Sequence, residues 1–148
     1  MSYQEKNITV SLMTYLLILG FYLLNLFQMY REASINSIEV FSLWGTIIMV
    51  AIIANIVAMI LTNIMLSIVH AIKTRTGETE SFIADERDKL IGLKGTRVSY
   101  IVFSVGVLLS MLTLVFDQPA LVMFSLLVFF SIAAEIVGDI SRLYYYRR

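Results

Sequence analysis

Four long apolar runs constrain this chain more than any other feature of its sequence. Each has about 20 residues or more, the length that an α-helix needs to cross a hydrocarbon core about 30 Å thick. Only 15% of the 148 residues are charged, against about 25% in soluble domains, so a soluble fold would leave much apolar surface in water. We therefore predict an all-α integral membrane four-helix bundle, a single domain 1–148 with spans at Ile8–Gln28, Leu43–Ile72, Val98–Phe116 and Ala120–Ile140.

The Lys and Arg residues predict the orientation of these spans. With four crossings, ten of the eleven basic residues fall on one side of the membrane, and Arg31 falls on the other. The positive-inside rule makes the basic side cytoplasmic and places both termini there. The first ten residues lack the basic start and the cleavage site of a signal peptide, so we expect the first span to remain in the mature protein. Trp44, near the start of the second span, is expected in an interfacial aromatic belt.

The cytoplasmic loop 73–97 holds half of the charged residues of the chain. Asp85 and Lys89 stand four residues apart in the order that stabilises a helix, and apolar residues flank the charges. We predict a short amphipathic helix in the headgroup layer, followed by a turn at Gly92 and Gly95 into the third span. The loop is either a solvated connector, a gate over the bundle, or a contact surface for a partner.

The sequence DERDKLIGLKGTRVSY, residues 85–100, resembles a motif in small, uncharacterised prokaryotic four-span membrane proteins. In those proteins a D-E-R-D cluster, a spaced Lys and a Ser-Tyr pair precede the third span. The resemblance implies a multi-pass protein of a prokaryotic plasma membrane and gives the motif importance, but it brings no named activity. The candidate cytoplasmic contact residues are Asp85, Glu86, Arg87, Asp88, Lys94, Arg97 and Tyr100.

The fourth span carries two carboxylates, which are costly inside a membrane and are functional candidates there. Glu135 and Asp139 lie four residues apart, on one helical face with Ser131 and Arg142. In a structural interpretation Asp139 pairs with Arg142, and Glu135 pairs with a basic group from another segment, with Arg97 the nearest in depth. In a functional interpretation the face is a cation or proton site. We expect Glu135→Gln to impair assembly or activity more than Asp139→Asn.

Polar residues of the second span complete the candidate site. Intramembrane amides mostly bond across packed helices, and a single His at a helix end is most often interfacial. By depth, His70 can also join the two carboxylates as a ligand. The candidate intramembrane polar site therefore comprises Glu135, Asp139, His70, Asn55 and Asn63.

Spans three and four are expected to form a tight helical hairpin. In the connecting DQP sequence, Asp117 is predicted to cap the fourth span and Pro119 to occupy its first turn. Both spans also carry small residues at helical spacing, which permit close approach of two helices in lipid. These small residues are Ser99, Gly106 and Ser110 in the third span, and Ala134 and Gly138 in the fourth.

The composition argues against several classes of function. The chain has no Cys and one His, and it lacks HExxH and GxSxG motifs, so we predict no catalytic, cofactor-binding or metal-binding residues. Zero net charge argues against a nucleic-acid partner. We predict a non-enzymatic accessory, regulatory or immunity-type subunit, whose partners are the lipid bilayer, further copies of the chain, and a cytoplasmic or membrane protein. The alternative is an oligomeric small transporter or channel with a polar site near Glu135.

Overall fold

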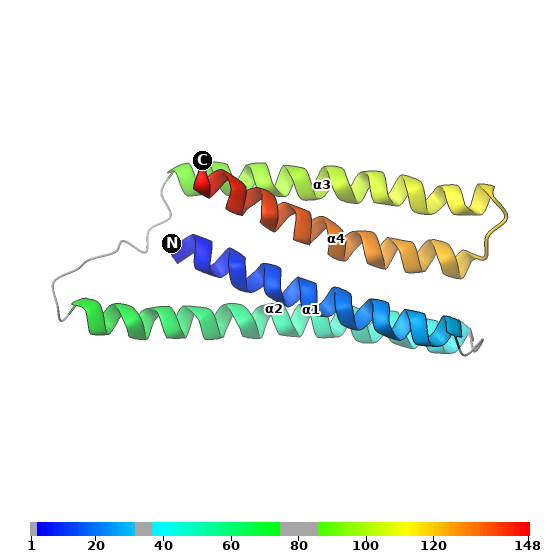
Figure 1. Cartoon of the computed structure of the whole chain (residues 1–148), viewed down its shortest axis with the longest axis horizontal. Coiled ribbons are helices and arrows are strands. Elements are labelled where there is room, and N and C mark those ends of the chain that lie inside the picture. The colour runs from blue at the N-terminus through cyan, green and yellow to red at the C-terminus, as the bar shows by residue number, and fades with distance from the viewer. Residues whose placement is uncertain (1–2, 32–36, 75–85) are drawn as a thin grey trace.

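The computed structural model describes residues 3–31, 37–74 and 86–148, and these residues form four long α-helices (Figure 1). Their bounds are α1 Tyr3–Arg31, α2 Ser37–Thr74, α3 Glu86–Val115 and α4 Ala120–Arg147. Each predicted span lies within one helix except for Phe116, and every helix is long and apolar enough to cross a membrane. The expectations of an all-α fold and a multi-pass chain are therefore confirmed.

The helices pack side by side in the order α2, α1, α4, α3. α4 lies between its two main neighbours, α1 and α3, and it touches α2 to a small extent. Within the described part of the chain, α3 makes no extensive contact with α1 or α2. The start of α1, the start of α3 and the end of α4 lie at one end of the bundle (Figure 1). The bundle is thus open along α3, which has one helical neighbour.

An apolar core joins α1, α2 and α4. Its centre holds Trp44, 6% exposed, whose ring lies edge-to-face with Phe41 at 4.9 Å between centroids and 5.4 Å from the ring of Phe124. The Tyr22 hydroxyl donates a hydrogen bond of 2.7 Å to the carbonyl oxygen of Ser125, which links α1 to α4. Trp44 therefore packs inward rather than facing lipid as an aromatic belt residue would. The buried core comprises Ile18, Tyr22, Val40, Trp44, Ile47, Ile132 and Ile136.

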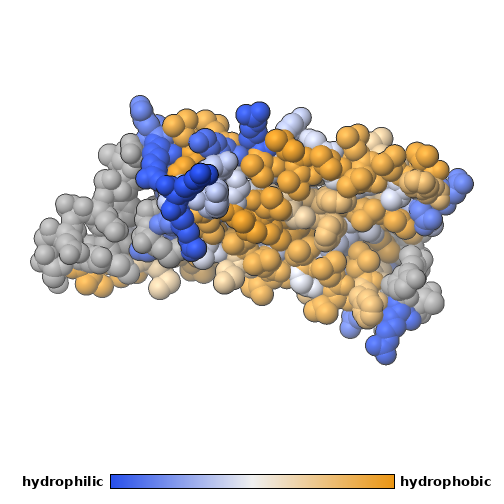
Figure 2. Space-filling model, turned by 45° about the horizontal axis from the view of Figure 1, so that its top comes forward, coloured by the Kyte–Doolittle hydropathy of each residue, from blue (hydrophilic) through white to orange (hydrophobic). Residues whose placement is uncertain are grey.

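Most large apolar side chains outside this core are exposed on the surface of the chain. Figure 2 shows orange, hydrophobic atoms across the middle of the visible face and blue, hydrophilic atoms mainly toward its two ends. This distribution is typical of a protein that has lipid around its middle and water at its ends.

The turn between α3 and α4 differs from the prediction in one respect. The amides of Asp117 and Gln118 bond the carbonyl oxygens of Leu114 and Thr113, at 3.2 and 3.1 Å. Together with the left-handed φ of 54° at Asp117, these bonds form a Schellman motif that ends α3. Asp117 therefore terminates α3 and does not cap α4. Pro119 is the N-cap residue of α4, without a side-chain cap.

Residues 86–97 form the first turns of α3 and continue without a break into its apolar part. The turn expected at Gly92 and Gly95 does not occur, because both residues are helical. The rest of the predicted amphipathic helix, including Asp85, lies outside the described residues. The charged segment thus extends the third span along the same axis, at least from Glu86 onward.

Candidate functional site

The polar face of α4 is anchored by a buried ion pair. Asp139 is 2% exposed, and its Oδ1 accepts a hydrogen bond from Nη1 of Arg142, one turn further along α4. Nη2 of Arg142 donates to Oγ1 of Thr96 on α3, at 3.2 Å. The predicted pairing of Asp139 with Arg142 is confirmed, and the pair also links α4 to α3.

Two glycines allow α3 and α4 to come close at this level. A Cβ at Gly95 would overlap the side chain of Arg142, and a Cβ at Gly138 would overlap the Ser99 hydroxyl. Gly95 therefore leaves room for the guanidinium that reaches α3, a different role from the predicted turn. Ser99 is 8% exposed, and its hydroxyl has no hydrogen-bond partner among the described residues.

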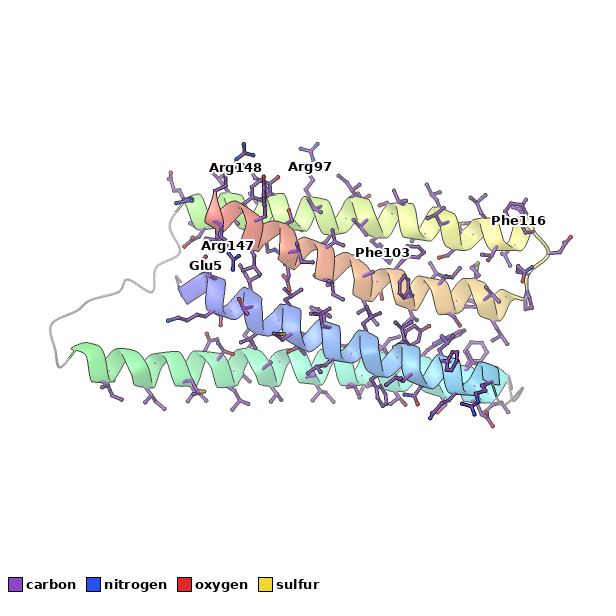
Figure 3. All side chains as sticks on the ribbon, viewed as in Figure 1. Glu5, Arg97, Phe103, Phe116, Arg147 and Arg148 are labelled. Carbon is purple, nitrogen blue, oxygen red and sulfur yellow. The ribbon has the colours of Figure 1, made fainter. Side chains whose placement is uncertain are left out.

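Glu135 lies one turn before Asp139 and is half-buried. Asp139 and Arg142 are both within electrostatic range of its carboxyl. Within the described residues it has no ion-pair partner, since Arg142 bonds Asp139 and Arg97 points away from α4 (Figure 3). The basic partner from another segment that we considered for Glu135 is therefore not found in the described part of the chain.

Glu135 lines a groove of about 370 Å³ between α3 and α4. Phe103 projects from α3 toward α4 along this groove, as its label in Figure 3 shows. The remaining lining residues are Thr96, Ser99, Tyr100, Ser131 and Ala134. Thr96 and Phe103 were not among the sequence candidates, although they share a helical face of α3 with Ser99 and Tyr100 at spacings of three, four and seven.

The polar residues of α2 lie in another part of the molecule. Asn55 lines a small pocket of about 50 Å³ between α1 and α2, with Asn7 and Ser11 of α1 among the other lining residues. Its Nδ2 donates to the carbonyl oxygen of Ala51, one turn back, at 3.0 Å. The structure therefore places Asn55 and Glu135 in pockets formed by different helix pairs.

Two further residues of the predicted polar site belong to the second half of α2. Asn63 is half-buried, and its carbonyl oxygen accepts a hydrogen bond of 2.8 Å from Ser67. His70 is helical, but its side chain lies outside the description. The described residues contain no group of three His, Cys, Asp or Glu side chains that could hold a metal ion.

The predicted cytoplasmic contact motif divides into an inner and an outer face. The Tyr146 hydroxyl donates to Oδ1 of Asp88 at 2.8 Å, and Nζ of Lys94 lies 5.0 Å from the ring centroid of Tyr145. Asp88 and Lys94 thus hold the start of α3 to the end of α4.

The outer face of the same turns is exposed. Leu90, Leu93, Arg97 and Tyr100 follow one another at spacings of three and four, so they form one stripe along α3. We call these four residues the outer stripe. Glu86 and Arg87 are also exposed, at the start of the helix.

No protein-family model matches this chain, and no curated protein and no solved structure shows significant similarity to it.

Proposed function

We propose that the chain is a non-enzymatic accessory, regulatory or immunity-type subunit of a prokaryotic plasma membrane. In this proposal both termini and the loop 73–97 are cytoplasmic, and the start of α3 contacts a cytoplasmic protein partner. The distribution of basic residues supports the orientation, since ten of the eleven would lie on the cytoplasmic side. The common end of the bundle shared by the start of α1 and the end of α4 is consistent with it.

The observation that carries the proposal is the division of the charged segment into two faces. Asp88 and Lys94 are bound to tyrosines of α4, which orders the start of α3. The outer stripe is then presented on a rigid helix, with two leucines beside a guanidinium and a phenol. Apolar anchors that are surrounded by charged groups and held on an ordered helix are typical of protein-binding surfaces.

Affinity purification from native membranes tests the docking role. The double variant Leu93→Glu/Arg97→Glu changes the outer stripe, and we expect it to recover at least tenfold less of the partner than the wild type recovers. Tyr146→Phe is the matched control, because it changes the inner face and should leave partner recovery unchanged. Equal recovery of the same proteins by the wild type and the double variant would contradict docking through the outer stripe.

The orientation has its own test, which is simple because the chain has no native Cys. Single variants Glu86→Cys and Gln118→Cys place a thiol at exposed positions at opposite ends of α3. A membrane-impermeant maleimide should label Gln118→Cys in intact cells, whereas Glu86→Cys should react after permeabilisation. The reverse pattern would place the charged segment outside the cell and exclude a cytoplasmic partner.

An oligomeric small transporter or channel is the second candidate. It is favoured by the half-buried Glu135, which has no ion-pair partner among the described residues. Four helices enclose no wide path, so this function requires several copies of the chain. Flux into proteoliposomes, with and without a pH gradient, should be present for the wild type and lost in Glu135→Gln if this function is correct.

A further inference from the structure

We propose that the groove between α3 and α4 binds a lipophilic organic cation, with Glu135 as the counter-ion and Tyr100 and Phe103 as the aromatic wall. This site is distinct from the outer-stripe docking surface and does not depend on it. The ligand class also holds whether the protein transports the cation or responds to it.

The charges around Glu135 favour a cation. Two carboxyls, Glu135 and Asp139, lie near one guanidinium, and that guanidinium is bonded to Asp139 and to Thr96. Among the described side chains around the groove, one negative charge is therefore left without a direct partner when both carboxyls are ionised. A half-buried carboxylate in a membrane-spanning helix is costly unless a cation or a proton compensates it.

The lining of the groove favours a lipophilic cation over a small hydrated one. Phe103 and Tyr100 lie on the same helical face of α3, one turn apart, and aromatic faces attract organic ammonium groups. A volume of about 370 Å³ falls within the usual range for small-molecule sites. A bare metal ion would need several hard ligands, and the described residues contain no such group.

The buried hydroxyl of Ser99 is the second observation that indicates a ligand. Ser99 lines the groove, is more than nine-tenths buried, and has no hydrogen-bond partner among the described residues. Buried polar atoms without partners are rare, because each costs free energy that a ligand or a water can recover. A ligand that offers a polar group beside its cationic centre can bond this hydroxyl.

The position of the groove indicates that the ligand enters from the bilayer. Tyr100 is 71% exposed and Phe103 is 39% exposed, so the aromatic wall is open at the lipid-facing surface of α3. Glu135 lies 15 residues along α4 from Ala120, about 22 Å at 1.5 Å per residue, which is within the membrane and past its middle. A hydrophilic cation would lose its hydration on this route, whereas a lipophilic cation already partitions into the membrane.

Binding of two ions of the same shape and opposite charge tests this site. The full chain is placed in nanodiscs of zwitterionic lipid, and equilibrium dialysis is run with tetraphenylphosphonium and with tetraphenylborate, with empty nanodiscs as the blank. We expect saturable binding of tetraphenylphosphonium and no saturable binding of tetraphenylborate. Saturable binding of both ions, or of neither, would overturn the assignment.

Variants then test which residues form the site. We expect Glu135→Gln to weaken binding of tetraphenylphosphonium at least tenfold, while Glu135→Asp retains most of the affinity. Asp117→Asn is the matched control, since this exposed acid lies at the far end of α4 and should have no effect. Tyr100→Ala should weaken binding several-fold more than Tyr100→Phe, which keeps the aromatic ring.

A loss of fold is separated from a loss of binding by the single Trp of the chain. Trp44 is buried in the α1–α2–α4 core, so its emission reports an intact bundle. If Glu135→Gln keeps the emission of the wild type and also keeps its affinity for tetraphenylphosphonium, Glu135 is not the counter-ion. If the variant loses both, the Glu135→Asp variant and the comparison of the two probe ions decide the outcome.

Discussion

The two interfaces of α4 are built from different kinds of residue. Toward α1 and α2, α4 packs bulky side chains such as Ile132 and Ile136 around Tyr22 and Trp44. Toward α3 it presents Ala134 and Gly138, which face Gly95 and Ser99 and their neighbours. The difference shows that membrane helices associate either by interlocking large side chains or by bringing backbones close together.

The small-residue interface also contains the charged groups of α4. Close approach of α3 and α4 lets Arg142 bond both Asp139 and Thr96. The bulky interface uses one neutral hydrogen bond between helices, from Tyr22 to the carbonyl oxygen of Ser125. We therefore expect the α3–α4 interface to be more sensitive to single substitutions, and three predictions test this difference.

The largest effect is expected from Gly138→Leu. Even a Cβ at this position overlaps the Ser99 hydroxyl, so a leucine must force α3 and α4 apart. We expect a loss of about 3 kcal/mol in the free energy of unfolding, measured in mixed SDS and dodecylmaltoside micelles. Spin labels on the variants Lys89→Cys and Tyr144→Cys should show a longer α3–α4 distance, while Trp44 emission stays unchanged.

Gly20→Leu is the matched control for Gly138→Leu. Gly20 is exposed on α1, and a Cβ there meets no atom within 4 Å. We expect no loss of stability, because leucine favours a helix more than glycine does. A similar loss for Gly138→Leu and Gly20→Leu would show that close approach of α3 and α4 is not what makes Gly138 important.

An intermediate effect is expected from Asp139→Asn. The substitution leaves the Arg142 guanidinium without its buried carboxylate, so we expect to lose about 2 kcal/mol of unfolding free energy. Glu135→Gln should cost less stability, since Glu135 has no ion-pair partner among the described residues. This order applies to stability, whereas the order expected from the sequence concerned assembly or activity. If Asp139→Asn is as stable as the wild type, the ion pair does not hold the small-residue interface together.

The smallest effect is expected from Ile47→Ala in the bulky interface. Ile47 is 1% exposed, so the substitution leaves a cavity. The unfolded helix stays in lipid, which is as apolar as the core, so the packing term remains and the transfer term largely disappears. We expect a loss of about 1 kcal/mol in the same micelle assay. Ile48→Ala, at an exposed position, should cost almost nothing, and equal costs at both positions would contradict a packed α1–α2–α4 core.

Most of the fold follows from local properties of the sequence. Hydropathy over about 20 residues identifies a membrane helix without reference to its neighbours, so the four spans were predictable. The Asp139–Arg142 pair was predictable for the same reason, because both groups lie on one helix three residues apart. The small residues of α3 and α4 predicted a close contact, and both Gly138 and Ser99 lie in that contact.

The rotation of each helix about its axis was decided by tertiary packing. Lipid does not distinguish one apolar face of a helix from another, so hydropathy could not show that Trp44 faces inward or that Arg97 faces away from Glu135. The same is true of the placement of Asn55 against α1 and of Glu135 beside α3, in separate pockets. The sequence by itself thus determined which segments cross the membrane, and packing between helices determined which polar groups meet.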